Sequence, residues 1–151
     1  MRRASEIKTA GTWDAASAID RVVLDAGERH RRRIALRGER GTAFLLDLPH
    51  AAALKDGDGL VLEDGTIVRV AGKAEPLIEI AASSPLELAR LAWHIGNRHT
   101  DLQIVEDRLR IRRDHVLEAM LVQMGAMLTA VDAPFDPEAV PQTPDPESHD
   151  H

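Results

Sequence analysis

The chain has 151 residues, of which 44% are hydrophobic and 29% are charged, and its net charge is −6. This composition is typical of a globular protein with one compact domain or two small ones, and no apolar run approaches the roughly 18 residues of a membrane-spanning helix, so we expect a cytoplasmic protein without a membrane partner. The negative charge and the few aromatic residues argue against a nucleic-acid partner, and the lack of cysteine excludes disulfides and thiolate metal sites.

The first half of the chain reads as short strands separated by turns. Runs with strand character at 21–25, 31–37 and 42–48 are separated by glycine-containing turns. The Asp64-Gly65 pair between "LVLE" and "TIVRV" is a strong hairpin signal, because glycine adopts positive φ at little cost. The sequence therefore predicts a small all-β sandwich or barrel as the N-terminal domain, over residues 1–73.

Two histidines of this half lie where strands are expected. His30 belongs to the basic run "RHRRR", which we interpret as the solvated face of a strand, with partner docking as the less favoured alternative. His50 follows "LDLP" at a strand end, where we expect no ligand role.

The second half begins with a strand and a capped helix. "EPLIEIAA" predicts the strand. The helix that follows has Ser84 as its N-cap, Pro85 at its first position and Glu87 placed to complete a capping box. Gly96 is expected to end this helix.

Two short strands come next, "LQIVE" and "RLRIR", which meet at Asp107. Asp114 is placed to cap a second helix that stops at Gly125, and "AMLTAVDAPF" predicts the last strand. The order β-α-β-β-α-β is that of a ferredoxin-like domain, which we place at residues 74–136. Residues 137–151 are rich in proline and acidic side chains and predict a flexible tail. The predicted fold class is α+β.

Catalytic motifs are absent from the sequence. It contains no G-x-x-x-x-G-K-[ST] phosphate loop, no H-E-x-x-H pair and no serine in a nucleophile-elbow setting, and "GDGLVL" fails G-x-G-x-x-G at the third glycine. We therefore expect a protein that is not an enzyme.

The segment "HIGNRH" carries two of the seven histidines. On a continuous helix the side chains of His94 and His99 would point about 140° apart, so they could not share one metal ion. Because Gly96 is expected to end the helix, His99 lies on the connection that leaves it. There it can bind a metal or only hydrogen-bond at the helix end, and the residues alone leave these two interpretations equal. One histidine per chain supplies two ligands if a two-fold axis brings its mate opposite.

The remaining histidines are weaker candidates. His94 is interpreted as an exposed or interface residue, and His115, in the first turn of the second helix, as a structural one. His149 and His151 flank Asp150 and suit a metal-capturing arm, although a vestige of a longer polar tail or an expression remnant explains them equally simply. Imidazole and carboxylate ligands without thiolates suit nickel, copper or zinc.

Several motifs together closely resemble the UreE family of urease nickel metallochaperones. They are "FLLDLP", "LKDGDGLVLEDG", "EPLIEI", "LAWHIGNRHT" and "DHVLEAML", and the resemblance covers nearly the whole chain up to Phe135. It implies a homodimer with an N-terminal β domain of peptide-binding type and a C-terminal ferredoxin-like domain for metal binding and dimerisation. It also implies that His99 pairs across the two-fold axis, with His149 and His151 assisting.

The resemblance further implies that Ni²⁺ passes to the urease accessory GTPase and then to apo-urease with its accessory proteins. Cu²⁺ or Zn²⁺ is expected to compete for the same ligands. Some family members carry a histidine where this chain has Arg113, which argues against a second site at His115; His94 and His115 stay candidates for a secondary metal site or a structural role. The alternative function is a peptide-binding, chaperone-like adaptor for urease assembly in which metal binding is incidental.

Overall fold

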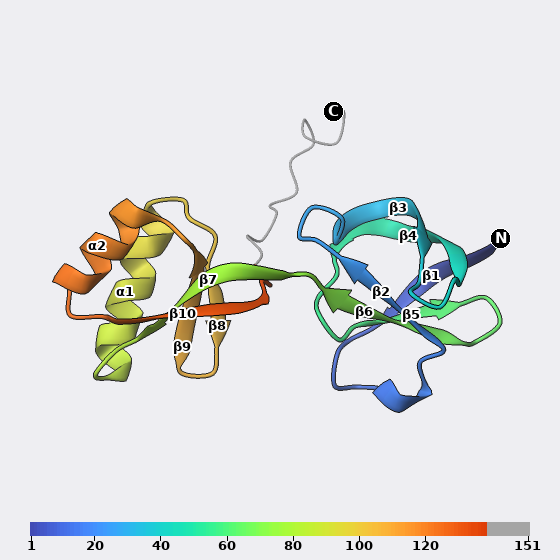
Figure 1. Ribbon diagram of the computed structural model, residues 1–151, viewed down its shortest axis with the longest axis horizontal. Coiled ribbons are helices and arrows are strands. Elements are labelled where there is room, and N and C mark those ends of the chain that lie inside the picture. Colours follow the sequence, from blue (N-terminus) through green and yellow to red (C-terminus); the bar gives the residue numbers. More distant parts are fainter. Residues whose placement is uncertain (139–151) are drawn as a thin grey trace.

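Two β-sheets follow one another along the chain, and each buries the apolar residues of its strands on one side. The structure is a computed structural model that describes residues 1–138, so the predicted arm histidines, His149 and His151, lie outside the described residues. Figure 1 shows the two sheets side by side, joined where β6 runs into β7. None of the described helices is long and apolar enough to cross a membrane.

The first sheet has six strands in the order β2-β6-β5-β1-β4-β3, with a short 3-10 helix between β1 and β2. Its elements are β1 (Arg2–Lys8), η1 (Ala15–Ser17), β2 (Asp20–Leu24), β3 (His30–Arg37), β4 (Ala43–Ala53), β5 (Gly59–Leu62) and β6 (Ile67–Gly72). The sheet curls around one apolar core that includes Phe44, Leu46 and Leu60, all fully buried. The predicted hairpin is confirmed: Gly65 has φ +84°, and the N–H of Thr66 donates to the Asp64 carboxylate at 3.0 Å.

Strand β1 was not predicted, and β4 extends beyond its predicted end. β1 turns only Ala4 and Ile7 toward the core, so its sequence "RRASEIK" lacks the apolar alternation that marks a strand. β4 continues past Pro49 to Ala53. Its register with β3 shifts at a bulge, which accommodates the proline, and the pairing resumes after it. His50 therefore lies within β4, where it is exposed, and not at a strand end.

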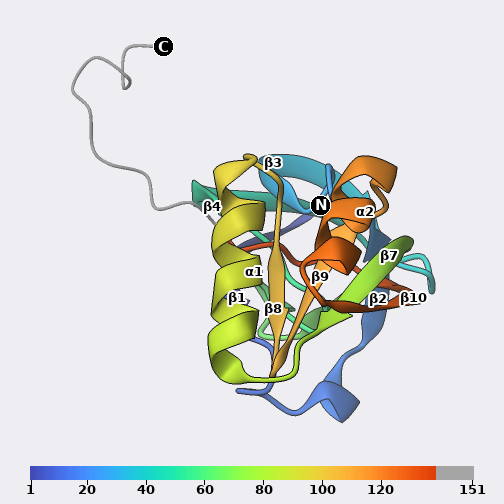
Figure 2. The same cartoon turned by 90° about the vertical axis from the view of Figure 1, so that its left-hand side faces the viewer.

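The second sheet confirms the ferredoxin-like order. Its strands run antiparallel in the order β10-β7-β9-β8, and both helices cover one face (Figure 2). Its elements are β7 (Ala74–Ala81), α1 (Pro85–Asn97), β8 (Gln103–Val105), β9 (Arg108–Arg112), α2 (His115–Gln123) and β10 (Met127–Pro134). The core between helices and sheet comprises Ile78, Ile80, Leu91, Ile95, Leu109, Ile111, Leu117 and Leu121.

Both helices begin at the predicted caps. The Ser84 hydroxyl accepts the N–H of Glu87 at 3.1 Å, but the Glu87 carboxylate accepts from Arg90 at 2.7 Å instead of completing the capping box. At α2 the reciprocal arrangement does form. Asp114 accepts the N–H of Leu117 at 3.0 Å, and the Glu118 carboxylate accepts the N–H of Asp114 at 2.7 Å.

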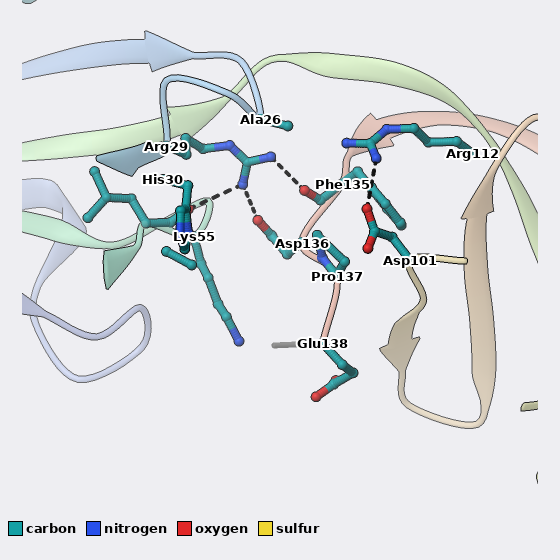
Figure 3. A pocket seen from close by; sticks show the side chains of 12 residues that line it. Ala26, Arg29, His30, Lys55, Asp101, Arg112, Phe135, Asp136, Pro137 and Glu138 are labelled. Carbon is teal, nitrogen blue, oxygen red and sulfur yellow. Dashed lines mark hydrogen bonds and ion pairs between the residues drawn. The ribbon is translucent and has the colours of Figure 1, made fainter. Parts of the chain in front are cut away.

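A buried arginine holds the two sheets together at their junction (Figure 3). The Arg29 side chain, 4% exposed, donates to the carbonyl oxygens of Leu54 at 3.3 Å and Phe135 at 2.5 Å, and it pairs with the Asp136 carboxylate. Gly72 passes so close to Pro134 that a Cβ on the glycine would lie 2.7 Å from the proline Cβ. The contact between the sheets is therefore close and specific.

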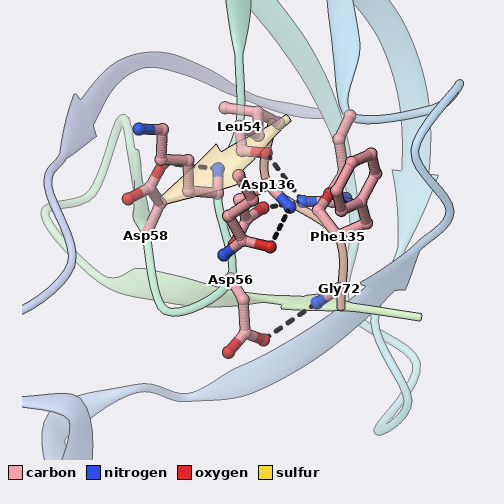
Figure 4. A network of polar contacts seen from close by, with 9 residues as sticks. Leu54, Asp56, Asp58, Gly72, Phe135 and Asp136 are labelled. Atoms are coloured by element: carbon pink, nitrogen blue, oxygen red, sulfur yellow. Dashed lines mark hydrogen bonds and ion pairs between the residues drawn. The ribbon is translucent and has the colours of Figure 1, made fainter. Parts of the chain in front are cut away.

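The loop before β5 is also fixed by carboxylates. The Asp58 carboxylate accepts the N–H groups of Lys55 at 2.8 Å and Ala10 at 2.9 Å, and Asp56 accepts the N–H of Gly72 at 3.0 Å (Figure 4). Because Asp58 is buried, both of its interactions are formed away from solvent. This loop carries Leu54, one of the partners of Arg29, to the junction.

The first residues of the predicted flexible tail are part of the junction. Phe135 is fully buried beneath the Arg112 guanidinium, which lies 4.6 Å from the ring centroid. Two residues into the predicted tail, the N–H of Glu138 donates to the carbonyl oxygen of Leu102 at 2.7 Å. The first two residues of the predicted tail thus lie against the second sheet's half of the chain, and the rest of the tail lies outside the described residues.

Candidate metal centre

Helix α1 does not end at Gly96 as predicted but continues to Asn97. Gly96 keeps a helical backbone, and a Cβ at this position would meet nothing within 4 Å, so no steric reason demands glycine there. Arg98 caps the helix, and the chain reverses at His99, whose φ is +56° and whose N–H donates to the carbonyl oxygen of Gly96 at 3.1 Å. The histidine itself takes the left-handed conformation that the prediction assigned to glycine.

This conformation makes His99 unusual. The left-handed residue after a helix is most often glycine or asparagine, because a Cβ clashes with the backbone there. A histidine at this position costs on the order of 1 kcal/mol relative to a relaxed backbone. His99 is also exposed, so burial of its ring does not offset that cost. Glu106, which is also exposed, has φ +53°, so two exposed side chains of residues 1–138 take this conformation.

The other two candidate histidines of this half lie elsewhere on the helices. His94 is exposed on α1, and its ring meets the Trp93 ring edge-on, with centroids 5.0 Å apart and planes at 89°. His115 is the first residue of α2 and is also exposed. Within residues 1–138, no three His, Asp or Glu side chains lie close enough together to hold a metal ion. The described part of one chain therefore does not assemble His94, His99 and His115 into a site.

Glu118, which follows His115 in the first turn of α2, is held by other groups. Burial raises the pKa of Glu118, but the Arg113 guanidinium at 3.1 Å and the N–H of Asp114 outweigh this effect and hold the pKa below its usual range. Glu118 is therefore ionised and engaged at the start of α2. Since Arg113 occupies this carboxylate, a second metal site at His115 has no local acidic ligand ready to join it.

Carboxylates on the face of the second sheet away from the helices are likewise paired. Glu79 contacts Arg108 at 2.6 Å and Arg110 at 3.0 Å, and the hydrogen bond from Arg108 is the largest cause of its lowered pKa. Arg112 contacts Glu75 at 2.9 Å and Asp101 at 3.3 Å. These ion pairs make the face a structural network whose carboxylates already have cationic partners.

Several large apolar side chains are exposed on the outer surface of the helical layer. Trp93 is 66% exposed and Val116 69% exposed, and Leu86 lies seven residues before Trp93 on the same side of α1. The Arg98 guanidinium contacts the Met120 sulfur at 4.0 Å, so the end of α1 that leads to His99 lies against α2. The sequence analysis did not identify this patch. The signal was the spacing of Leu86 and Trp93, on the side of α1 opposite its core residues.

Comparisons with known proteins agree with this two-part organisation. A family model described as UreE urease accessory protein, N-terminal domain, matches residues 2–72, and one described as UreE urease accessory protein, C-terminal domain, matches residues 75–151. A urease accessory protein UreE from Rhodopseudomonas palustris (strain BisB18) is 56% identical over 152 aligned residues, which cover 100% of this chain and 72% of the relative.

Two further relatives with the same name give similar values. The protein of Bradyrhizobium sp. (strain BTAi1) is 56% identical over 138 residues, covering 91% of this chain and 66% of the relative. The protein of Chelativorans sp. (strain BNC1) is 51% identical over 121 residues, covering 80% of this chain and 77% of the relative. The chain thus spans about two thirds to three quarters of the length of these relatives.

Proposed function

Because the chain belongs to the UreE family of urease accessory proteins, we propose that it binds Ni²⁺ through His99 at the two-fold axis of a homodimer and delivers it in the cytoplasm to the urease assembly machinery. In this proposal residues 1–73 form the partner-binding domain and residues 74–136 the metal-binding and dimerisation domain. Residues 137–151 form a histidine-containing arm.

The observation that supports the proposal is the left-handed backbone conformation of His99. An exposed histidine with φ +56° occupies a position where glycine would be less strained, so the imidazole is retained at a cost to stability. One histidine cannot hold a transition metal ion in a closed shell, and residues 1–138 offer no cluster that completes it. A second copy related by a two-fold axis supplies a matching imidazole from the same position.

The exposed apolar residues of the helical layer support dimerisation. Trp93 is 66% exposed and Val116 69% exposed among residues 1–138, and large exposed aromatic side chains are typical of interface centres. A contact through this layer would bring two copies together on the side of the domain from which His99 emerges. Dimerisation would also stabilise a small domain that buries limited surface alone.

Delivery requires a site that holds its metal ion without trapping it. The chain has no cysteine, so its ligands are imidazoles, carboxylates and water, which exchange more readily than thiolates. We propose that His149 and His151 complete the shell and help to pass Ni²⁺ to the accessory GTPase, and from it to apo-urease with its accessory proteins. The role is transfer of the ion and not turnover of a substrate. Cu²⁺ and Zn²⁺ compete for the same ligands.

Calorimetric titration with Ni²⁺ tests the site. We expect one tightly bound ion per two chains, at least a hundredfold weaker binding for His99→Ala, and unchanged binding for the matched control His94→Ala. Truncation after Glu138 should weaken binding less than His99→Ala does. Unchanged affinity of the His99→Ala variant would refute the proposed site.

Sedimentation velocity tests the dimer separately. With chelator present, Trp93→Ser should shift the protein toward the monomer, because it removes the largest exposed apolar side chain of the helical layer. A variant of the opposite sheet face, Thr129→Ser, serves as the control. If Trp93→Ser leaves both the sedimentation coefficient and the metal stoichiometry unchanged, the interface lies elsewhere.

A further inference from the structure

Strand β3 forms one edge of the first sheet and is rich in arginine. It has eight residues, pairs with β4 on one side, and among residues 1–138 no strand pairs with its other side. In Figure 1 it runs along the outside of the curled sheet. Ile34 and Leu36 face the core, whereas Arg33 and Arg37 are exposed on the other face. A long edge strand with free backbone groups is a template for pairing with another chain.

The opposite edge of the same sheet is covered. The N–H of Glu39 donates to the carbonyl oxygen of Arg21 at 2.8 Å, so the turn after β3 lies against β2. The buried Asp20 carboxylate accepts the N–H groups of Arg40 at 2.9 Å and Thr42 at 3.1 Å. The sheet therefore has one edge closed by its own chain and one edge open.

The arginines of the open edge have no carboxylate partners. None of Arg31, Arg32, Arg33 and Arg37 forms an ion pair within 4.0 Å inside the described range 1–138. The carboxylate facing this strand, Asp47, contacts Arg3 at 3.5 Å instead. Arg32 donates to the carbonyl oxygen of Leu48 at 3.1 Å. The guanidinium groups of Arg31, Arg33 and Arg37 can donate to carboxylates in bidentate geometry.

Charge is unevenly distributed along the chain. Residues 1–73 contain 13 Lys and Arg against 11 Asp and Glu, whereas residues 74–151 contain 6 against 14. The only excess of positive charge in this acidic chain therefore lies in the domain with the open edge. A surface of this sign steers an acidic partner toward β3 and repels a basic one.

We propose that the open edge of β3 binds an extended acidic segment of a partner protein, which adds to the sheet as a further strand. Backbone hydrogen bonds along the edge would supply sequence-independent affinity, and Arg33 and Arg37 would select carboxylates on one face of the segment. The inference does not depend on metal binding, because none of the residues that carry it is a proposed metal ligand.

The cavity at the junction extends this surface. His30 begins β3 and lines the cavity of about 390 Å³ together with Lys55 and the buried Arg29 (Figure 3). The Nε of Arg29 is buried and has no hydrogen-bond partner among the described residues. Asp101, Asp136 and Glu138 also line this cavity, and Asp136 is paired with Arg29, so the lining carries both signs of charge. His30 and Lys55 form no ion pair among residues 1–138, and they are the groups that a carboxylate at the end of the bound segment would meet there.

Charged residues on an edge strand also have a simpler use, since they discourage aggregation. That role needs charge of either sign and no particular ligand, whereas docking needs positive charge and a free backbone. Reversal of the charge separates the two explanations. Arg33→Glu with Arg37→Glu keeps the edge charged but removes the attraction for carboxylates. The matched control, Lys8→Glu with Lys73→Glu, changes the net charge equally at exposed sites outside β3.

The test uses a fluorescein-labelled ten-residue peptide that alternates Glu with Thr, followed by fluorescence anisotropy at low salt. We expect saturable binding to the full chain, at least tenfold weaker binding to the Arg33/Arg37 variant, and a change of less than twofold for the Lys8/Lys73 control. A peptide with N-methyl groups on alternate amides should bind at least tenfold more weakly, because it cannot pair along the edge. Circular dichroism melts must show that both variants fold as the unchanged protein does.

Four outcomes would overturn the proposal. The first is equal binding by the Arg33/Arg37 variant, and the second is equal binding of the N-methylated peptide, which would exclude strand addition. The third is equally tight binding of a ten-residue oligothymidylate, which would make the surface a general polyanion site. The fourth is peptide binding that appears only after truncation at Glu138, which would identify the chain's own acidic arm as the occupant.

Discussion

The junction between the sheets and the end of helix α1 differ in whether their polar side chains are buried and hydrogen-bonded. At the junction, Arg29 is buried and reaches three acceptors from two distant parts of the chain. At the end of α1, His99 is exposed, and only its backbone is hydrogen-bonded. The first region is organised for stability and the second is strained without an internal compensation. In our proposal, the exposed imidazole of His99 is the group that acts outside the chain.

Replacing the buried Arg29 should give the largest loss of stability. Arg29→Met leaves the Asp136 carboxylate, 16% exposed, and the carbonyl oxygen of Phe135 without their donors. We expect the free energy of unfolding to fall by about 3 kcal/mol. Urea denaturation followed by circular dichroism measures it. The control Arg21→Met removes an exposed pair with Glu39 and should cost about 0.5 kcal/mol or less. Equal losses in the two variants would show that the junction contributes no special stability.

A second buried carboxylate extends the comparison to acid stability. Burial raises the pKa of Asp20, but hydrogen bonds from Arg40, Thr42 and Arg21 outweigh it and lower the pKa to about 2. Because the folded-state pKa lies below the unfolded value of about 3.9, Asp20 stabilises the fold above pH 4, and this contribution disappears as the pH falls from about 4 to 2. Asp20→Asn should therefore cost about 2 kcal/mol at pH 7 and progressively less below pH 4.

The exposed Asp107 provides the control for this experiment. Its side chain is 91% exposed, so Asp107→Asn should change the free energy of unfolding by less than about 0.5 kcal/mol at any of these pH values. Unfolding by urea at pH 7, 4 and 2.5 gives both curves. A loss for Asp20→Asn that stays constant down to pH 2.5 would contradict the assigned cause.

At the end of α1, replacing His99 by glycine should stabilise the fold and abolish the proposed nickel binding. His99→Gly removes the Cβ clash and should raise the free energy of unfolding of the metal-free protein by up to about 1 kcal/mol. His99→Ala keeps the Cβ, so it should give no such gain, although both variants should lose the tight nickel site. The measurement is thermal unfolding in chelator at one protein concentration. A His99→Gly variant less stable than His99→Ala would mean that the backbone there is not strained.

The smallest expected changes in stability come from the two glycines that were both predicted to end helices. Gly96 has a helical backbone with open space for a Cβ, so Gly96→Ala should stabilise the protein by about 0.5 kcal/mol. Gly125 has φ +89° after α2, so Gly125→Ala should destabilise it by about 1 kcal/mol. Effects of the same sign in both variants would contradict the different helix ends described above.

The helix ends also show what the sequence could predict. Ser84, Asp114 and Gly125 act locally, through neighbours within four residues, and their roles were confirmed. Gly96 followed the same local rule, and its prediction was wrong because His99 takes the left-handed position against its own conformational preference. A single sequence shows the conformational preference of each residue, and it cannot show where a residue adopts a conformation against that preference.

The junction could not be predicted for a different reason. Arg29 is one of the four arginines in "RHRRR" and carries the same charge as the exposed Arg31. Its partner Asp136 lies 107 residues further along the chain. Likewise β1 is recognisable only from the strands on both its sides, β4 and β5. Contacts between distant segments depend on the completed fold. The metal site has the same limit, because its proposed second half belongs to another copy of the chain.

The close passage of Gly72 past Pro134 has a consequence for any assembly. One polypeptide segment crosses from the first sheet to the second at this point, Pro134 packs against it, and the hydrogen bond from Arg29 to the Phe135 carbonyl oxygen beside it resists twisting. In a symmetric dimer joined through the helical layers, the two N-terminal sheets would be held at a set separation and orientation. A bivalent partner whose two acidic segments match that spacing would gain avidity from simultaneous engagement, and one with the wrong spacing would bind as if each site were alone.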